Sequence, residues 1–211
     1  LYVGTSGWAY DWNPNGLEWY SRESKFNAIE LNMSFYSFPQ KTTVERWREE
    51  SGKLRWSVKV HRSITHIRRL NENSIPIWEK FLSIFEPLED KIDFYLFQLP
   101  PNFQFNEEVK RRLSRYATFS EKIAIEPRHV SWFNREAYTF FEEKGLVFVT
   151  PDSPLFKGLP PDGVIKIRGI VYIRLHGRLV YYNYGYLDEE LEEVVEKVIE
   201  TKPEKALSLI H

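Results

Sequence analysis

The chain has 211 residues, of which 42% are hydrophobic, so it can bury a sizeable core. Its 29 basic and 30 acidic residues nearly balance, which argues against a general nucleic-acid or membrane-surface binder. It has no cysteine, which excludes disulfides, thiolate nucleophiles and zinc–cysteine sites. There is no apolar run of ~20 residues and no signal-peptide pattern at the start, so we expect a cytoplasmic protein with no membrane partner. Abundant Lys, Arg and Glu favour a thermophilic source.

Strand-like apolar runs alternate with helical patterns along most of the chain. Eight strands are predicted, at residues 2–5, 28–31, 56–60, 94–98, 123–126, 147–150, 171–175 and 205–210. Helical spacing of apolar residues predicts helices at residues 43–50, 75–85, 107–116, 135–144 and 187–200. Gly145 follows the fourth of these as a C-cap glycine should.

This alternation predicts the α/β class, with parallel strands forming a TIM-like (β/α)8 barrel in a single domain over residues 1–211. The chain is short against the ~250 residues typical of that fold. We attribute the difference to helix 6, replaced by the Pro- and Gly-rich loop 151–170, and to a final helix that is absent or truncated. An open doubly wound sheet is the alternative, but no G-x-G-x-x-G motif follows the first strand.

Side chains of a strand alternate between its two faces, so each strand can be divided into a helix-facing and an inward side. In "VYIRLHGR", Ile173 and Leu175 face helices, whereas Arg174 and His176 face inward. In "FYLFQLP", Tyr95 likewise faces a helix. Polar inward residues collect at the same end of successive strands, namely Glu30, Asn32, Lys59, Gln98, Glu126, Arg128, Asp152, Arg174 and His176. Buried ion pairs could merely fill a barrel, but the gathering at one end favours a ligand site.

These stretches also carry a family resemblance. The motifs are "VGTSGWAYDW" at 3–12, "IELNMSFYSFP" at 29–39, "WSVKVHRSITH" at 56–66, "FQLPPNF" at 97–103, "AIEPRHVSW" at 124–132 and "YIRLHG" at 172–177. In this order they resemble the domain of unknown function 72 family, also called YecE-like. The resemblance implies a TIM-barrel fold and supplies no activity. Pro127 departs from the Phe-like residue expected before Arg128, and the family usually continues after the eighth strand with an Asn-rich segment and a helix.

The first interpretation is a metal-independent enzyme without a cofactor, which carries out acid–base chemistry on a small anionic metabolite or sugar phosphate as a hydrolase, lyase or isomerase. Arginine forks bind carboxylate and phosphate oxygens, and a carboxylate with a histidine can move a proton. The predicted catalytic residues are Glu30, Lys59, Glu126 and His176. The predicted substrate-binding residues are Tyr10, Asn32, Tyr36, His66, Gln98, Arg128, Trp132, Asp152 and Arg174. Glu126→Gln and Arg174→Ala are expected to abolish activity and barely lower stability, unless the two residues form a structural buried pair.

Other functions stay open at this stage, as does whether the protein is an enzyme at all. A metal-dependent isomerase or endonuclease-like enzyme could use Glu30, Glu126, Asp152 and His176 as ligands, although three cations share the predicted rim. A non-catalytic module could bind phosphate or nucleic acid through the basic stretch 59–70, with nucleic acid the less favoured partner. Two glutamates could also serve a glycosidase, for which their separation would decide the mechanism.

Overall fold

A computed structural model describes residues 1–181 and 183–210. The chain divides into two compact units: an N-terminal unit, Tyr2–Gln98, and a C-terminal unit, Leu99–His211 together with Leu1. The prediction that the chain is a single domain stays a prediction.

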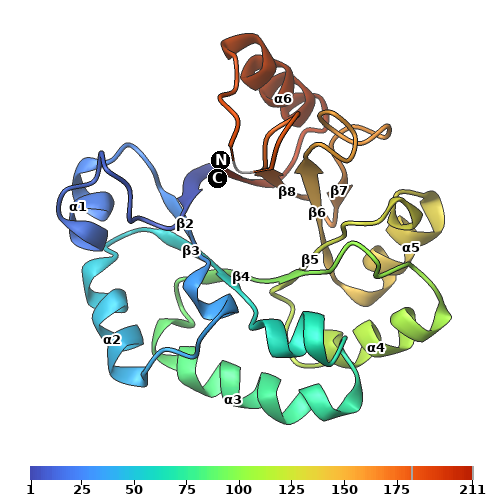
Figure 1. The fold of residues 1–211 in the computed structure, drawn as a ribbon, viewed down its shortest axis with the longest axis horizontal. Helices are drawn as coiled ribbons and strands as arrows, with labels where there is room; N and C mark the ends of the chain where they lie inside the picture. The colour runs from blue at the N-terminus through green and yellow to red at the C-terminus, as the bar shows by residue number, and fades with distance from the viewer. Residues whose placement is uncertain (182, 211) are drawn as a thin grey trace. The chain divides into compact units, whose positions relative to one another are not determined.

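The N-terminal unit contains four parallel strands joined through helices. The strands are β1 (Tyr2–Ser6), β2 (Ala28–Leu31), β3 (Arg55–Lys59) and β4 (Ile92–Gln98), each hydrogen-bonded to the next. The helices are α1 (Gly16–Glu23), α2 (Lys41–Glu50) and α3 (Ile75–Phe85), which lie on one side of the strands (Figure 1). Short helical turns follow the strands or flank α3, at η1 (Met33–Phe35), η2 (Ser63–Ile67), η3 (Glu72–Ser74) and η4 (Glu86–Leu88).

Aromatic packing holds α3 against β4. Trp78 of α3 is fully buried, and its ring meets Tyr95 at 5.2 Å and Phe97 at 5.1 Å between ring centroids, both edge to face. Such pairs add to the large apolar area that each ring removes from water. The packing confirms the prediction that Tyr95 occupies the helix-facing side of its strand, and Phe97 lies on the same side.

The C-terminal unit contains four further parallel strands and a short antiparallel one. The parallel strands are β5 (Ile123–Glu126), β6 (Val147–Asp152), β8 (Ile170–Leu175) and β9 (Lys205–Ile210), and β7 (Lys166–Ile167) runs antiparallel to β8. Its helices are α4 (Glu107–Ala117), α5 (Arg135–Lys144), α6 (Asp188–Glu200) and the single turn η5 (Val130–Trp132).

Local sequence signals set the ends of these helices. Asn106 caps α4 by accepting the Val109 N–H at 3.0 Å, and Asn134 caps α5 in the same way. Gly145 ends α5 in the left-handed conformation, which confirms the predicted C-cap.

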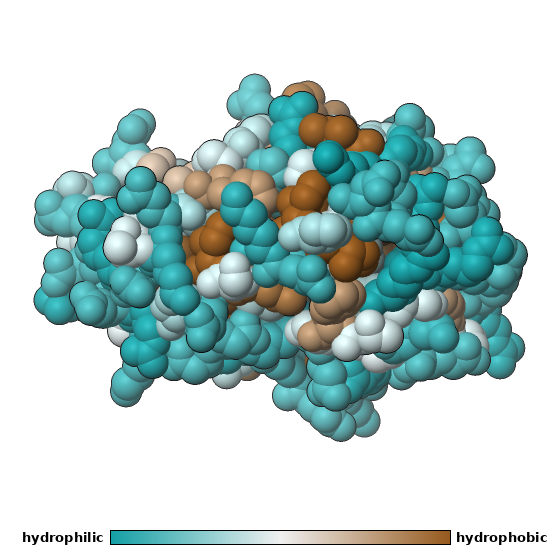
Figure 2. Space-filling view, turned by 90° about the horizontal axis from the view of Figure 1, so that it is seen from below, coloured by the Kyte–Doolittle hydropathy of each residue, from teal (hydrophilic) through white to brown (hydrophobic). Residues whose placement is uncertain are grey.

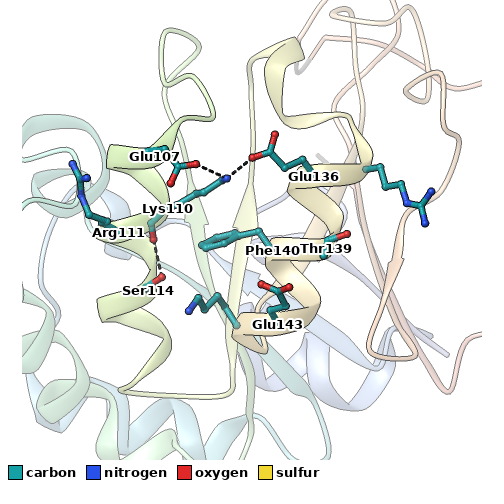
Figure 3. A pocket seen from close by; sticks show the side chains of 10 residues that line it. Glu107, Lys110, Arg111, Ser114, Glu136, Thr139, Phe140 and Glu143 are labelled. Carbon is teal, nitrogen blue, oxygen red and sulfur yellow. Dashed lines mark hydrogen bonds and ion pairs between the residues drawn. The ribbon is translucent and has the colours of Figure 1, made fainter.

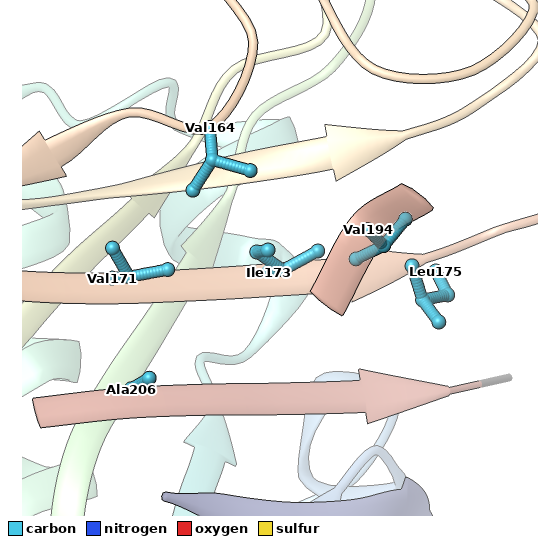
Figure 4. Packing of buried hydrophobic residues seen from close by; sticks show 6 residues of the cluster. All are labelled: Val164, Val171, Ile173, Leu175, Val194 and Ala206. Carbon is cyan, nitrogen blue, oxygen red and sulfur yellow. The ribbon is translucent and has the colours of Figure 1, made fainter. Parts of the chain in front are cut away.

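Helix α6 covers the outer face of β8. Val194 of α6 packs with Val171, Ile173 and Leu175 of β8, in a cluster completed by Val164 and Ala206 (Figure 4). This confirms that Ile173 and Leu175 face a helix. Because side chains alternate along a strand, Arg174 must then point to the opposite face.

The eight predicted strands are all present, with bounds shifted by at most two residues. No α-helix lies among the described residues 153–169, so a loop takes the place of helix 6 as predicted. Helix α1 and strand β7 were not predicted. Only Leu17 and Tyr20 of α1 are buried, which is too short an apolar stripe to recognise in sequence, and β7 has two residues.

In the described part of the chain, no helix is long and apolar enough to cross a lipid bilayer. The face seen in Figure 2 is mostly hydrophilic, with hydrophobic residues gathered near its middle.

Candidate functional site

Three neighbouring strands of the C-terminal unit end in charged residues. Glu126 is the last residue of β5 and Asp152 the last residue of β6, while Arg174 lies near the end of β8 and His176 just after it. In the β6–β8 pairing, Pro151 is opposite Arg174. Parallel strands end at one edge of a sheet, and in α/β barrels this carboxyl edge carries the active site. The strand order therefore explains why residues 50 positions apart in sequence meet here.

Four predicted site residues form one buried cluster. The Glu126 carboxylate accepts ion-pairing contacts from Arg128 and Arg174, and its Oε1 lies 3.0 Å from Nε2 of His176. Nε2 of His176 is also 3.0 Å from Nη2 of Arg128. Glu126 and Arg174 are fully buried, His176 is 1% exposed and Arg128 is 8% exposed. Arg128 is thus the member of the cluster most open to solvent.

Burial and the neighbouring charges determine the protonation states of Glu126 and His176. Burial by itself would raise the pKa of Glu126, but Arg128 and Arg174 outweigh burial and hold that pKa well below its usual range. Burial lowers the pKa of His176 to about 3, although Glu126 opposes this. At neutral pH the cluster therefore contains a carboxylate, two guanidinium groups and a neutral imidazole. Neutral Nε2 can donate to Glu126 when it carries the proton or accept from Arg128 when it does not.

A tyrosine that the sequence did not single out covers this cluster. The Arg128 guanidinium carbon lies 5.1 Å from the centroid of the Tyr181 ring, within cation–π range. The same ring is 6.2 Å from the His176 ring and is 37% exposed. The Tyr181 ring therefore lies between the buried cluster and the protein surface. The preceding basic and apolar residues give no periodic signal that would have placed it here.

Asp152 is engaged by partners other than the cluster around Glu126. Its fully buried carboxylate accepts hydrogen bonds from Arg178 Nε at 3.2 Å, Arg178 Nη2 at 3.1 Å and the Tyr186 hydroxyl at 2.7 Å. Arg178 and Tyr186 were not predicted. The substrate-binding role of Asp152 stays a prediction, but these three bonds occupy most of the acceptor capacity of its carboxylate.

Four predicted site residues of the N-terminal unit lie near or shortly after the ends of β1 and β2, namely Glu30, Tyr10, Asn32 and Tyr36. Glu30 is fully buried and accepts the Ser6 hydroxyl at 3.1 Å. Tyr10 donates to the Ser6 carbonyl at 3.0 Å, and its pKa is raised mainly by burial. Asn32 is half-buried. The 68% exposure of Tyr36 places it at the surface.

A second group in the N-terminal unit surrounds Phe35. The buried Lys59 ammonium lies 4.4 Å from the centroid of the Phe35 ring, and His66 meets that ring edge-on at 5.0 Å. His66 stands in the π-helical turn η2, and such turns often occur at functional sites. Gln98 is half-buried at the end of β4. The roles of Glu30, Lys59, Asn32, Tyr36, His66, Gln98 and Tyr10 stay predictions.

Trp132 is packed inside the C-terminal unit. Its ring is fully buried, its indole Nε1 donates to the Phe103 carbonyl at 2.6 Å, and Phe105 packs on it at 5.1 Å. Its indole donor is satisfied and its ring adds to the packing of the core, while its substrate-binding role stays a prediction.

A groove between α4 and α5 forms a concave surface of the C-terminal unit (Figure 3). Lys110 crosses it and pairs with Glu107 on α4 and Glu136 on α5. Its lining holds none of the predicted site residues, and its charges are the solvated pairs usual between surface helices.

Across residues 1–181 and 183–210, no three His, Asp or Glu side chains come close enough together to hold a metal ion. The metal-dependent alternative therefore has no assembled ligand set in this part of the chain.

Comparison with known proteins assigns the chain to a family. The family described as "Protein of unknown function DUF72" matches residues 2–211. The chain belongs to the DUF72 family. The DUF72 protein is 33% identical to YecE of Escherichia coli K12 over 108 residues, which are 49% of this chain and 39% of YecE. It is 25% identical to YunF of Bacillus subtilis 168, over 92% of this chain and 81% of YunF. The match to YecE thus spans about two fifths of the length of that protein.

Solved structures identify the fold of the DUF72 protein. A crystal structure of a DUF72 family protein from Thermotoga maritima MSB8 is similar to it with a TM-score of 0.87 and 27% identity, over 100% of this chain and 91% of the other. A xylose isomerase-like TIM barrel, fused to 4-hydroxyphenylpyruvate dioxygenase, matches with a TM-score of 0.60 and 12% identity, over 98% of this chain and 38% of the other. The fold is therefore the predicted TIM-like α/β barrel. At 12% identity the second likeness concerns the fold alone.

Proposed function

We propose that the DUF72 protein is an enzyme that binds the phosphate or carboxylate group of a small metabolite at Arg128 and Arg174, and that it uses His176 for acid–base chemistry beside that group. The observation that supports this is the convergence of two guanidinium groups and a neutral imidazole on Glu126, at the carboxyl ends of β5 and β8. Guanidinium forks match the oxygens of phosphate and carboxylate.

Glu126 is better suited to hold the arginines than to carry a proton. Its pKa is held well below the usual range by Arg128 and Arg174, so it stays ionised at neutral pH and cannot act as an acid. In the proposed enzyme its carboxylate orients both guanidinium groups. Its predicted catalytic role is thereby replaced by an orienting one.

His176 is the group that an anionic ligand would activate. Arg174 and Arg128 add to the effect of burial in lowering its pKa to about 3, which makes the free imidazole a weak base. An anion bound beside these arginines offsets their charge, so it raises the pKa of His176 toward neutrality. Proton transfer at Nε2 would then depend on the ligand being bound.

Titration with inorganic phosphate tests the proposal. Isothermal calorimetry and thermal unfolding are compared for the wild type, Arg128→Gln and the matched control Arg111→Gln, since Arg111 is an exposed arginine on α4. Phosphate should bind and stabilise the wild type and Arg111→Gln, and Arg128→Gln should lose the response. A wild type without any response, or an Arg128→Gln variant with a full response, would overturn the proposed anion site.

The same samples test the acid–base role. The NMR titration of the His176 ring should move to higher pH when phosphate saturates the site. Phosphate binding without any shift of this titration would instead favour a binding module that carries out no chemistry.

A further inference from the structure

Asp152, the last residue of β6, binds the segment that follows β8 through several hydrogen bonds. The backbone carbonyl of Asp152 accepts the His176 N–H at 2.9 Å. The carboxylate of the same residue accepts two bonds from Arg178 and one from Tyr186. A single fully buried residue therefore holds the segment at positions 176, 178 and 186.

Tyr186 links the Asp152 carboxylate to the turn after β8. Its hydroxyl donates to Asp152 and accepts the Gly177 N–H at 2.9 Å. Burial and the bond to Asp152 both raise the pKa of Tyr186, so it keeps its proton and remains a donor. Gly177 has a φ of +92°, and a Cβ added there would meet the Val180 carbonyl oxygen. The turn is thus tight and specified by glycine.

Arg178 links the Asp152 carboxylate to α6. Its Nη2 lies 2.8 Å from Glu193 and its Nη1 lies 3.7 Å from Glu190, in addition to its bonds with Asp152. Tyr184 donates a hydrogen bond to Glu190 at 2.6 Å. The guanidinium of Arg178 is therefore held between the end of β6 and the first turns of α6.

Tyr181 lies in sequence between Arg178 and Tyr186, the two residues that bind Asp152. Its ring covers the Arg128 guanidinium at 5.1 Å. We propose that Asp152, Arg178 and Tyr186 are positioning residues that hold the Tyr181 ring over Arg128, and that they thereby set the affinity of the anion site. The effect on affinity rests on the proposed function, whereas the placement of the ring does not. A ring over the guanidinium excludes water from one of its faces, and charges attract each other more strongly where water is excluded.

Two hydroxyl deletions two positions apart test this. Tyr186→Phe removes the hydroxyl that joins Asp152 to Gly177, and Tyr184→Phe removes the hydroxyl that contacts Glu190 alone, so the latter is the matched control. The first readout is the ring-current shift of the Arg128 side-chain protons in arginine-labelled protein, with Tyr181→Leu as the reference for a missing ring. The second readout is the dissociation constant for inorganic phosphate.

We expect the ring-current shift to fall toward the Tyr181→Leu value in Tyr186→Phe and to persist in Tyr184→Phe. Phosphate affinity should fall about two- to tenfold in Tyr186→Phe, the range that corresponds to the loss of one cation–π contact. Arg178→Met removes the other partner of Asp152 and should cause the same loss of the shift.

The two proposals fail in different ways. An unchanged ring-current shift in both Tyr186→Phe and Arg178→Met would overturn the positioning role, as would an equal loss in the Tyr184→Phe control. If the shifts follow the expected pattern but the wild type does not bind phosphate, the positioning role stands and the proposed anion-binding function fails.

Discussion

Replacing Glu126 by Gln should strongly destabilise the folded protein. The change keeps the size of the side chain and removes its negative charge, which leaves the guanidinium groups of Arg128 and Arg174 without the carboxylate between them. Arg174 and Glu126 are both fully buried, so water cannot take the place of the lost partner. The expectation from sequence allowed for a structural buried pair, and the burial of both residues favours that alternative over an unchanged stability.

The size of the effect follows from the burial of the pair. Removing one partner of a buried ion pair typically costs about 3–5 kcal/mol, because the remaining charge is left uncompensated. For a chain of this length, each kcal/mol lowers Tm by roughly 2–4 °C, so the expected fall is about 6–20 °C. The exposed Glu108, which pairs with Arg112 one turn along α4, offers the same substitution with an expected cost of about 0.3–0.5 kcal/mol.

Urea and thermal unfolding followed by circular dichroism measure both variants against the wild type. The burial argument requires Glu126→Gln to lose several times more stability than Glu108→Gln, with an unchanged dependence on urea concentration. If Glu126→Gln were as stable as Glu108→Gln, the buried guanidinium groups would not depend on the Glu126 carboxylate for compensation of their charge, and the predicted cost would be wrong.

Three other predictions concern a titration, a helix cap and a turn. The pKa of His176 is about 3 in the folded protein and near 6.5 in the unfolded chain, so the unfolded state binds more protons between these values. The free energy of unfolding should therefore fall as the pH drops from 6.5 to 5, by up to about 1.4 kcal/mol per pH unit. Urea denaturation of His176→Asn should show a shallower fall over the same range. Equal slopes for the variant and the wild type would mean that His176 is protonated in the folded protein. Asn106→Ala removes the acceptor of the Val109 N–H and should cost about 1 kcal/mol in thermal unfolding, with Asn106→Ser recovering most of it; no difference between the two would show that the cap is unused. Gly177→Ala should destabilise by more than about 1 kcal/mol, because its positive φ and the Val180 carbonyl leave no room for a Cβ; a wild-type Tm would contradict this.

Much of the fold could be predicted because its signals are local. Alternation along β8 assigned Ile173 and Leu175 to the helix-facing side, and the packing of Val194 against them confirms it. Asn106 and Gly145 mark helix ends through contacts within a few residues. Helix α1 was missed because its stability comes from packing two buried residues and not from a long apolar stripe.

The candidate site was predicted less completely, because its contacts join distant parts of the chain. Alternation placed Glu126 and Arg174 on inward faces, but it could not show that they pair across 48 positions. Arg178 and Tyr186 lie 26 and 34 positions from Asp152, in a segment with no periodic pattern. The full burial of Trp132 also has no local signal in the sequence.

The sequence by itself determined which segments form strands and helices and which side chains share a strand face, since both depend on periods of 2 and 3.6 residues. Only the tertiary structure decided the charge states and the partners. Glu126 stays ionised because Arg128 and Arg174 converge on it, and His176 is neutral mainly because it is buried. Electrostatic energy depends on distance through space and on removal from water, and neither quantity is set by spacing along the chain.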